Sequence, residues 1–413
     1  MSNNWIDDAR EIFKVRKIDT NNLKNKYKCI YFPWSDEYEK TDIFQQLPLI
    51  IIKPINILEL QDILDYAHYK KCSISMIQDK ILTEIIIIMS NFNTMSINRN
   101  ILTVGGGVTY KQINKYLFDN DINYYSIFQD SPHESNELVL NKLDYDSGNL
   151  RRMYGLAIDL IESISITVPP TRDRDSMTLS VSRNQLSDLF WALCGGKASN
   201  FGYISEIKYK LIIVNNVMEY NILWDGVDNM KKIIDFWSET SISRPNEYTE
   251  NININNNSIS LNGLYIVPDK ETESESNIKI SKTLESLVNE TNGVLTIKRK
   301  MKENVKKIKT PYSIFSDIID SESITNDIDK NNCSIKIDLL GGNITTHKTG
   351  IFPFRNSNFL INYNTDKHLI PFSYQYYYSY DYDKLVDIKY KYDPLKVLSY
   401  SGIKYYCFSS KNV

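Results

Sequence analysis

Glycine is scarce in this chain of 413 residues, and its scarcity limits the sites that the sequence can build. Only 15 glycines are present, and the first is Gly105. Residues 1–104 therefore cannot form a glycine-lined phosphate loop, because backbone N–H groups approach a phosphate most closely where side chains are absent. A Walker sequence is absent too, which excludes a P-loop nucleotide site.

Cysteine and histidine are also few, and their spacing fits neither a disulfide framework nor a metal site. The cysteines are odd in number and form no CxxC pair, so we expect free thiols in a reducing compartment. They are Cys29, Cys72, Cys194, Cys333 and Cys407. The histidines lack metal-ligand spacing, and no GxSxG motif accompanies them, so we expect no metal. They are His68, His133, His347 and His368.

Long apolar runs and an excess of positive charge are missing as well. The longest apolar runs are short, such as Ile85–Met89, so we expect no membrane span. Residues 1–10 do not have the pattern of a signal peptide. The formal charge of -3 argues against a nucleic-acid partner. We therefore expect a cytoplasmic or virion-associated protein. The virion alternative rests on the abundance of Tyr, Asn, Ile and Lys, which is typical of an AT-rich genome such as that of a large DNA virus or a protist.

What is present is the pattern of a globular protein with more than one domain. The chain is 42% hydrophobic and 24% charged, and its length exceeds that of an ordinary single domain. Up to about residue 213, predicted strands mix with helices, which indicates an α+β or α/β domain. The strands are Leu47–Pro54, Ser73–Ile77, Ile85–Met89, Ile101–Val104, Ile161–Val168 and Ile204–Val214. The helices are one capped by Asn56, Tyr110–Phe118 and Leu186–Leu193.

A second region follows, with strands and two helices but no internal repeat. Two polar, compositionally biased stretches, Asn251–Asn257 and Glu271–Ser276, are predicted to be loops. The expected strands are Tyr220–Trp224, Leu261–Val267, Gly293–Lys298 and Cys333–Leu339, and the expected helices are Met230–Ser238 and Ile280–Val288. The tail from Pro371 is tyrosine-rich and then helical over Asp383–Tyr392.

Two local motifs leave alternatives open. Gly105-Gly106-Gly107 lies between a predicted strand and a predicted helix, so it is either a tight turn or a ligand-binding loop. Its spacing fails the Rossmann pattern, because Tyr110 stands where the third glycine would be. The tyrosines of the tail either pack in a core or interface, or line a pocket in which Tyr376 or Tyr378 acts as a general base.

Several further segments stand in an order that matches one protein family. Gly148–Asp159 reads GNLRRMYGLAID, and Asp188–Gly196 reads DLFWALCGG before Asn200-Phe201-Gly202. Leu385–Pro394 ends in YDP, and Ile351–Arg355 reads IFPFR. These segments resemble the G-x-L-S-R-x-Y-G-L-A-x-D, DLFWALRGGG…NFG, RL…IK.KYDP and AFPHR patterns of the berberine-bridge-enzyme-like FAD-linked oxidases. That family belongs to the vanillyl-alcohol-oxidase superfamily, whose FAD-binding domain is of the PCMH type.

The resemblance covers about residues 45–400 and implies an α+β fold. It implies a two-subdomain FAD-binding domain over 41–213 and a substrate-like domain with an antiparallel sheet over 214–370. An N-terminal leader, 1–40, precedes them, and a C-terminal segment, 371–413, returns to the FAD domain. In the family, the flavin oxidises an alcohol, sugar or alkaloid by hydride transfer. The positions that the resemblance places at the cofactor are Gly105, Gly106, Gly107, Tyr154, Gly155, Asp159, Gly195, Gly196 and Gly202.

Departures from the family pattern fall on the loops that hold the flavin. Ser75–Asp79 occupies the place of the family's glycine-rich R-S-G-G-H pyrophosphate loop, and Leu143–Gly148 that of its L-G-G-G-x-G loop. Met76 and Ile77 would hinder the approach of phosphate, and Asp79 would repel it. His133 falls near the family's covalent cysteine, and Phe354 replaces a usual histidine.

The sequence therefore leaves three functions in competition. The favoured one is a divergent FAD-oxidase fold with a degenerate pyrophosphate loop, acting as a non-catalytic structural or binding protein of possible viral origin. The second is an active FAD-dependent oxidase of a carbohydrate or alcohol with non-covalent flavin. The third is a self-assembling or virion-associated protein. A structural or self-assembling role implies a homo-oligomer or structural assembly. A binding or oxidase role implies a small-molecule or carbohydrate ligand.

Overall fold

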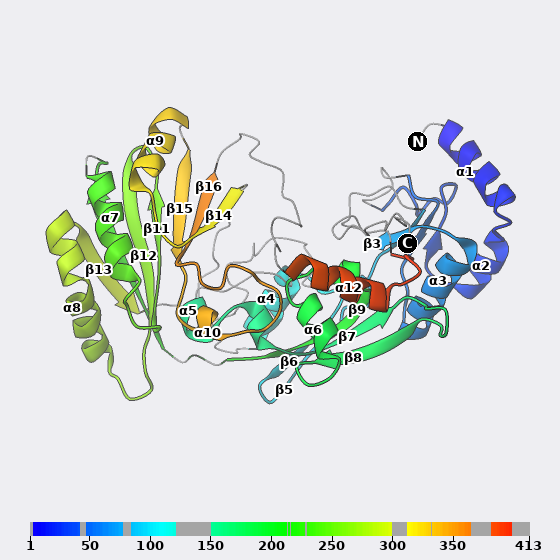
Figure 1. Cartoon of the computed structure of the whole chain (residues 1–413), viewed down its shortest axis with the longest axis horizontal. Coiled ribbons are helices and arrows are strands. Elements are labelled where there is room, and N and C mark those ends of the chain that lie inside the picture. The colour runs from blue at the N-terminus through cyan, green and yellow to red at the C-terminus, as the bar shows by residue number, and fades with distance from the viewer. Residues whose placement is uncertain are drawn as a thin grey trace, which may run out of the picture.

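The computed structural model describes most of the chain as three β-sheets and their helices (Figure 1). The described residues are 3–41, 47–76, 84–120, 150–212, 214, 216–227, 229–299, 312–331, 333–364 and 381–398. The α+β class predicted from the sequence is confirmed. None of the described helices combines the length and apolar character that a membrane span requires.

The first sheet has four strands in the order β1-β2-β4-β3 and includes the N-terminal leader. Strands β2, β4 and β3 run parallel, and β1 pairs antiparallel with β2. Strands β2 and β4 are runs of buried isoleucine, as expected for parallel strands covered on both faces. The elements are α1 (Asn3–Val15), α2 (Thr20–Lys26), β1 (Ile30–Tyr31), β2 (Ile50–Ile52), α3 (Ile57–Lys70), β3 (Ile74–Met76) and β4 (Ile85–Ile87).

The second sheet has five antiparallel strands in the order β5-β6-β9-β7-β8. It shares one hydrophobic core with the first sheet and with the C-terminal helix α12. Its strands are β5 (Met95–Asn98), β6 (Ile101–Gly105), β7 (Ile161–Val168), β8 (Met177–Ser182) and β9 (Tyr203–Lys210). Its helices are α4 (Tyr110–Asp119), α5 (Arg151–Tyr154), α6 (Ser187–Leu193) and α12 (Tyr382–Tyr392), with 3-10 turns at Ala157–Leu160 and Ala198–Asn200.

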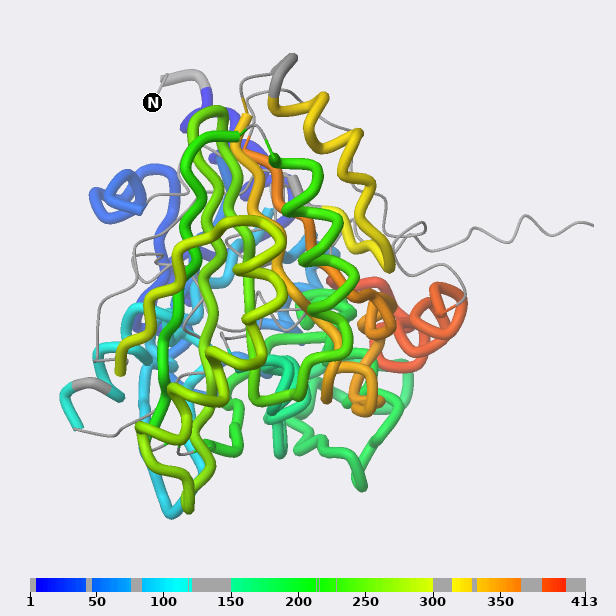
Figure 2. The backbone as a smooth tube through the Cα atoms, turned by 90° about the vertical axis from the view of Figure 1, so that its left-hand side faces the viewer, coloured from blue at the N-terminus to red at the C-terminus, as the bar shows by residue number. Residues whose placement is uncertain are grey.

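The third sheet has seven antiparallel strands in the order β13-β10-β12-β11-β15-β16-β14. Helices α7, α8 and α9 cover only the face that is turned away from the other two sheets, and Figure 2 shows α7 and α8 in front of the strands. The strands are β10 (Val217–Asp225), β11 (Tyr248–Ile254), β12 (Ser258–Ile266), β13 (Val294–Arg299), β14 (Tyr312–Ser316), β15 (Ser334–Leu339) and β16 (Phe359–Asn364). The helices are α7 (Met230–Ser241), α8 (Glu273–Thr291), α9 (Ser321–Asn331) and the short α10 (Asn343–Thr346).

The core beneath these three helices contains one buried carboxylate. Glu250 of β11 is fully buried and accepts hydrogen bonds from the Tyr220 hydroxyl (2.6 Å) and the Trp237 indole N–H (2.8 Å). It also forms an ion pair with the buried Arg244. Three donors thus compensate for the loss of hydration of this carboxylate.

Both predicted loops in the second region are wrong in part. Residues Asn251–Ile254 belong to strand β11, where asparagine and isoleucine alternate between the two faces of the sheet. Helix α8 begins at Glu273, because Thr272 and Glu275 form a reciprocal capping box. Polar composition concealed a strand in the first case and a capped helix in the second.

The expectation of free thiols is confirmed for the cysteines that the structure describes. Cys29, Cys72, Cys194 and Cys333 form no disulfide. Across the described ranges, no group of three His, Cys, Asp or Glu side chains gathers as a metal site would need.

Candidate functional site

Three of the family-like segments meet around a buried ion pair in the second sheet's half of the molecule. The carboxylate of Asp159 receives two hydrogen bonds from Arg355, at 2.8 and 3.1 Å. Its oxygen Oδ2 also accepts the N–H of Leu156 at 2.8 Å. Arg355 further donates to the carbonyls of Thr349 and Ile344. The pair therefore fixes the loop before β16 against the turn that precedes β7.

Gly155 makes this arrangement possible. Its φ of +86° is unfavourable for residues with a side chain, and a Cβ atom here would lie 2.7 Å from Asp159 Oδ2 and 2.9 Å from His347. A substitution would therefore push the turn away from the carboxylate. Tyr154, next to it, is half-buried, and burial together with the charge of Asp269 raises the pKa of its phenol.

The DLFWALCGG segment packs against the same loop. The carbonyl of Cys194 accepts the N–H of Ile351 at 2.9 Å. Burial raises the pKa of the Cys194 thiol, so this side chain stays protonated and is a poor nucleophile. Phe354, in the position of the family's histidine, instead stacks on Phe315 of β14, with ring centroids 4.6 Å apart.

The C-terminal helix α12 is held by a second buried ion pair. Lys389 and Asp393 are both fully buried and lie 3.1 Å apart. The Lys389 ammonium also donates to the carbonyl of Asn200 at 2.6 Å, and Asp393 accepts the N–H of Val397 at 2.8 Å. Burial lowers the pKa of Lys389, while the charge of Asp393 opposes that shift. The KYDP segment is thus anchored to the NFG segment.

Helix α5 joins this half of the molecule to the seven-stranded sheet. Arg151 donates to Asp338 of β15 at 3.1 Å, and Arg152 donates to the carbonyls of Leu340 and Arg244 at 2.8 and 2.7 Å. Burial alone would raise the pKa of Asp338, but the charges of Lys336 and Arg151 lower it below its usual range. Asp338 is therefore ionised at neutral pH.

The glycines that the resemblance places at the cofactor all use their backbone N–H groups inside the protein. Each donates to a backbone carbonyl, so a phosphate could recruit it only by breaking that bond. The donor and acceptor pairs are Gly105 to Thr94, Gly106 to Ser205, Gly107 to Phe92, Gly155 to Arg151, Gly195 to Leu193, Gly196 to Ala192 and Gly202 to Ala198. At Gly107, a Cβ atom would lie 2.0 Å from the carbonyl oxygen of Met89, so this turn packs closely against the chain before β5.

The structure thus brings together some predicted site residues and leaves others aside. Gly155 and Asp159 share the buried ion-pair centre with the segment of Gly195, whereas the Gly105 turn bonds to the segment before β5 and to β9. Tyr376, Tyr378, His133 and the two altered loops, apart from Ser75 and Met76, lie outside the described residues. Sequence reasoning missed the junction arginines and Asp338, which no local motif marks. The resemblance, however, included Arg151 and Arg152 in its GNLRRMYGLAID segment.

Comparison with curated proteins finds FAD-linked oxidoreductases, and no family model matches the chain. The "FAD-linked oxidoreductase azaL" of Aspergillus niger is 33% identical over 149 residues, which are 34% of this chain and 29% of that protein. The "Hexose oxidase" of Chondrus crispus is 34% identical over 86 residues, or 19% of this chain and 16% of that protein. The matches therefore span less than a third of these relatives' length.

Solved structures show the fold over nearly the whole chain. The wild-type Physcomitrella patens BBE-like 1 structure superposes with a TM-score of 0.73 at 15% sequence identity. The superposition covers 91% of this chain and 96% of that one. At this identity, the likeness establishes the architecture of the two halves and their arrangement.

Proposed function

We propose that this chain is an FAD-linked oxidoreductase. The premise is that it is a divergent relative of the berberine-bridge-enzyme-like FAD-linked oxidases and has their fold. The observation that carries the proposal is the convergence of its family-like segments. The Asp159–Arg355 pair joins the GNLRRMYGLAID segment to the IFPFR segment, and Lys389, paired with Asp393, anchors the KYDP segment to the NFG segment. The curated sequence relatives, which carry FAD in their names, support the cofactor.

FAD, where bound, supplies a hydride acceptor for oxidation of an alcohol-type carbon. The described residues could form the frame of such a site. The seven glycines do not offer its phosphate contacts, because their N–H groups already bond within the protein. These glycines therefore supply no phosphate contact as they stand, and residues 77–79 and 143–148 of the two altered loops lie outside the described residues. The chain's own described residues, led by Asp159, Arg355 and Lys389, would position the segments around the flavin.

The second candidate is a protein that has lost the flavin and acts in binding or assembly. The specific observation in its favour is the sequence SMIQD at Ser75–Asp79, which has no glycine. A glycine-free loop approaches a pyrophosphate poorly, and Asp79 repels it. A viral role would be a special case of this candidate.

The experiment is the visible absorption spectrum of the purified full-length protein, native and after acid precipitation. We expect a flavin spectrum whose colour passes into the acid supernatant, as a non-covalent flavin requires. Colour that stays in the pellet would mean covalent attachment and make His133 the first residue to substitute. A protein that stays colourless after incubation with FAD would contradict the proposal and favour the second candidate.

If flavin is present, the general base becomes testable. We place the base at Tyr376 or Tyr378, so Tyr376→Phe or Tyr378→Phe should lower turnover about 100-fold, the low end of the effect of losing a general base. The flavin spectrum should not change in these variants. An unaltered rate and pH profile in both variants would remove these tyrosines from the mechanism.

A further inference from the structure

Strand β13 forms one edge of the seven-stranded sheet, at the opposite end of the molecule from the first sheet (Figure 1). Its residues 294–299 pair with β10 along their whole length. Among the strands that the structure describes, none pairs with β13 on its other side. An edge of this kind is a template on which a further strand can form hydrogen bonds.

The backbone of β13 is suited to such pairing. In an antiparallel pair, alternate residues direct both their N–H and C=O groups to the neighbouring strand, and the residues between them direct these groups away from it. Three of the six residues of β13 therefore point backbone groups outward. None of the six is proline, so each outward residue offers a donor as well as an acceptor.

The side chains of β13 alternate between the two faces of the sheet. Leu295 and Ile297 are half-buried and pack against the core beneath the helices. Thr296 lies between them and is exposed on the opposite face, as are Val294 and Lys298. A strand added beside β13 would cover the outer flanks of Leu295 and Ile297, and the apolar core would then continue across the edge.

The sequence of β13 is complementary to itself in an antiparallel register centred on Thr296. A two-fold axis there places Thr296 opposite its own copy and Leu295 opposite Ile297 of the second copy. Val294 then lies opposite Lys298 of the second copy. Apolar side chains thus meet on the core side, and two threonines, which form a stabilising cross-strand pair, meet on the other side.

The charges at this edge favour the same register. Lys298 and Arg299 lie at the end of β13, whereas the exposed Asp225 ends β10 beside the start of β13. Antiparallel pairing brings the basic end of one copy towards the acidic end of the other. The Cα atoms of the two Lys298 residues would lie about 14 Å apart, beyond the Debye length of about 8 Å at physiological salt. The Lys298 ammonium also lies 3.5 Å from Glu219 of its own chain, so repulsion between the copies is small.

We infer that β13 pairs antiparallel with β13 of a second copy of this chain, so that two seven-stranded sheets join into one. The homo-oligomer that the sequence led us to expect is then a dimer with its two-fold axis at Thr296. The pairing extends the sheet in its own plane, so Leu223 and Val294, which stand on its face, remain exposed. The joined edges lie away from the first two sheets, and the dimer does not depend on the proposed function (Figure 1).

The test is sedimentation velocity of the full-length protein over a concentration series from about 1 to 100 µM, a range that reveals weak association. We expect a species of twice the monomer mass whose share grows with concentration. A monomer throughout the series would overturn the inference. Flavin absorbance of the same samples reports on the proposed function separately, so the failure of one leaves the other standing.

Cysteine substitution locates the axis. Thr296→Cys brings two Cα atoms to about 5 Å, within the range of a disulfide, so mild oxidation should give a covalent dimer on a non-reducing gel. Val294→Cys, on the same face of the same strand, is the matched control, because its two copies lie about 14 Å apart and should not cross-link. The wild type gives the background from the chain's own cysteines. A dimer in which Thr296→Cys does not cross-link above this background would overturn the pairing at β13.

A charge at the axis should weaken the dimer. Thr296→Lys places like charges directly opposite one another and should raise the dissociation constant of the dimer about fivefold. Ser96→Lys adds the same charge at an exposed position of β5, the edge strand of the five-stranded sheet, and should leave the constant unchanged. Equal effects in the two variants would contradict the inference. Circular dichroism of each variant checks that the fold is retained.

Discussion

The two faces of the seven-stranded sheet come from alternate residues of the same strands but differ in the side chains that they carry. The face beneath α7, α8 and α9 is lined by buried apolar side chains such as Ile252 and Ile337. The opposite face carries half-buried asparagines such as Asn251 and Asn253 and a compensated Lys336–Asp338 pair. An antiparallel sheet commonly buries one face and leaves the other polar.

The difference indicates which face of the sheet carries its stability. Burial of apolar area supplies most of the folding free energy, so substitutions beneath the helices should mainly unfold the protein. The amides contribute little net energy, because each exchanges a bond to water for a bond to protein. Substitutions on the opposite face should therefore leave the stability of the protein nearly intact.

The largest loss of stability is expected at Glu250, whose carboxylate is buried beneath the helices. Glu250→Gln removes the charge that compensates the buried Arg244, and breaking a buried ion pair costs about 4 kcal/mol of unfolding free energy. Urea unfolding followed by tryptophan fluorescence measures it. Glu219→Gln on the opposite face is the control, and its cost should stay below about 1 kcal/mol. Equal losses in the two variants would contradict the contrast between the faces.

A neighbouring pair on β11 compares the faces at adjacent residues. Ile252→Ala leaves a cavity in a fully buried position and should cost about 3 kcal/mol in the same unfolding measurement. Asn253→Ala, one residue further along the strand, should change stability by no more than about 0.5 kcal/mol. A comparable loss at Asn253 would mean that its amide bonds hold the fold together.

The sequence predicted these faces unevenly. Strand β7 was predicted residue for residue, because Ile161–Val168 alternates β-branched apolar residues with polar ones. Strand β11 was missed because Asn251 and Asn253 are followed closely by the asparagines at 255–257, and the stretch then looks like a polar loop. The alternation Asn-Ile-Asn-Ile was the signal that identified a strand.

The candidate site was predictable as a set of segments but not as a set of contacts. The family resemblance grouped Gly148–Asp159 with Ile351–Arg355. Asp159 and Arg355, however, are separated by 196 positions, so no local pattern pairs them. The same holds for Arg151 and Asp338, which are separated by 187 positions.

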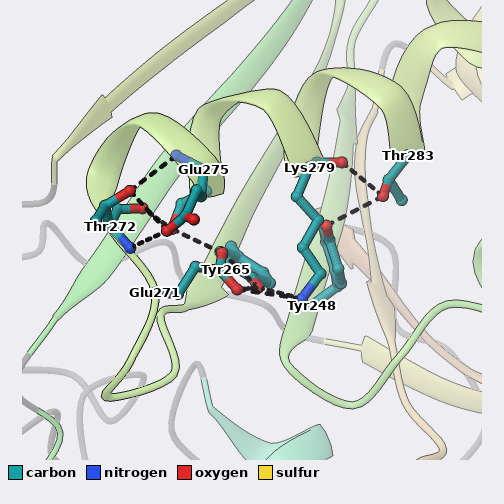
Figure 3. Close-up of polar contacts among 8 residues, drawn as sticks. Tyr248, Tyr265, Glu271, Thr272, Glu275, Lys279 and Thr283 are labelled. Carbon is teal, nitrogen blue, oxygen red and sulfur yellow. Dashed lines mark hydrogen bonds and ion pairs between the residues drawn. The ribbon is translucent and has the colours of Figure 1, made fainter.

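A smaller effect is expected at the start of helix α8, on the helix-covered side. There Glu271 accepts hydrogen bonds from Ser276 and Tyr265 and from Lys279 (Figure 3). Burial alone would raise the pKa of Glu271, but these bonds lower it below its ordinary value of 4.5. Burial raises the pKa of Tyr265 to about 12, so its hydroxyl remains a donor at neutral pH.

Glu271→Gln should therefore cost about 1 kcal/mol at neutral pH and weaken the acid dependence of stability. Because the folded pKa of Glu271 is depressed, its contribution is present above pH 4.5 and is lost as the pH falls through the folded pKa. Thermal unfolding measured from pH 7 down to pH 3 tests this. Glu273→Gln, in the first turn of α8, is the control for loss of charge alone. Identical acid dependence in both variants would show that the network at Tyr265 contributes nothing.

The smallest effect is expected where the uncovered side of the sheet carries apolar residues. Leu223 and Val294 are direct strand partners beside Ser260, and they are 53% and 67% exposed. Leu223→Thr and Val294→Thr remove only exposed apolar surface, and threonine is a β-branched residue that suits a strand. Stability should therefore change by less than about 0.5 kcal/mol. A loss of more than about 1 kcal/mol in urea unfolding would contradict this exposure and would mean that this end of the sheet is covered.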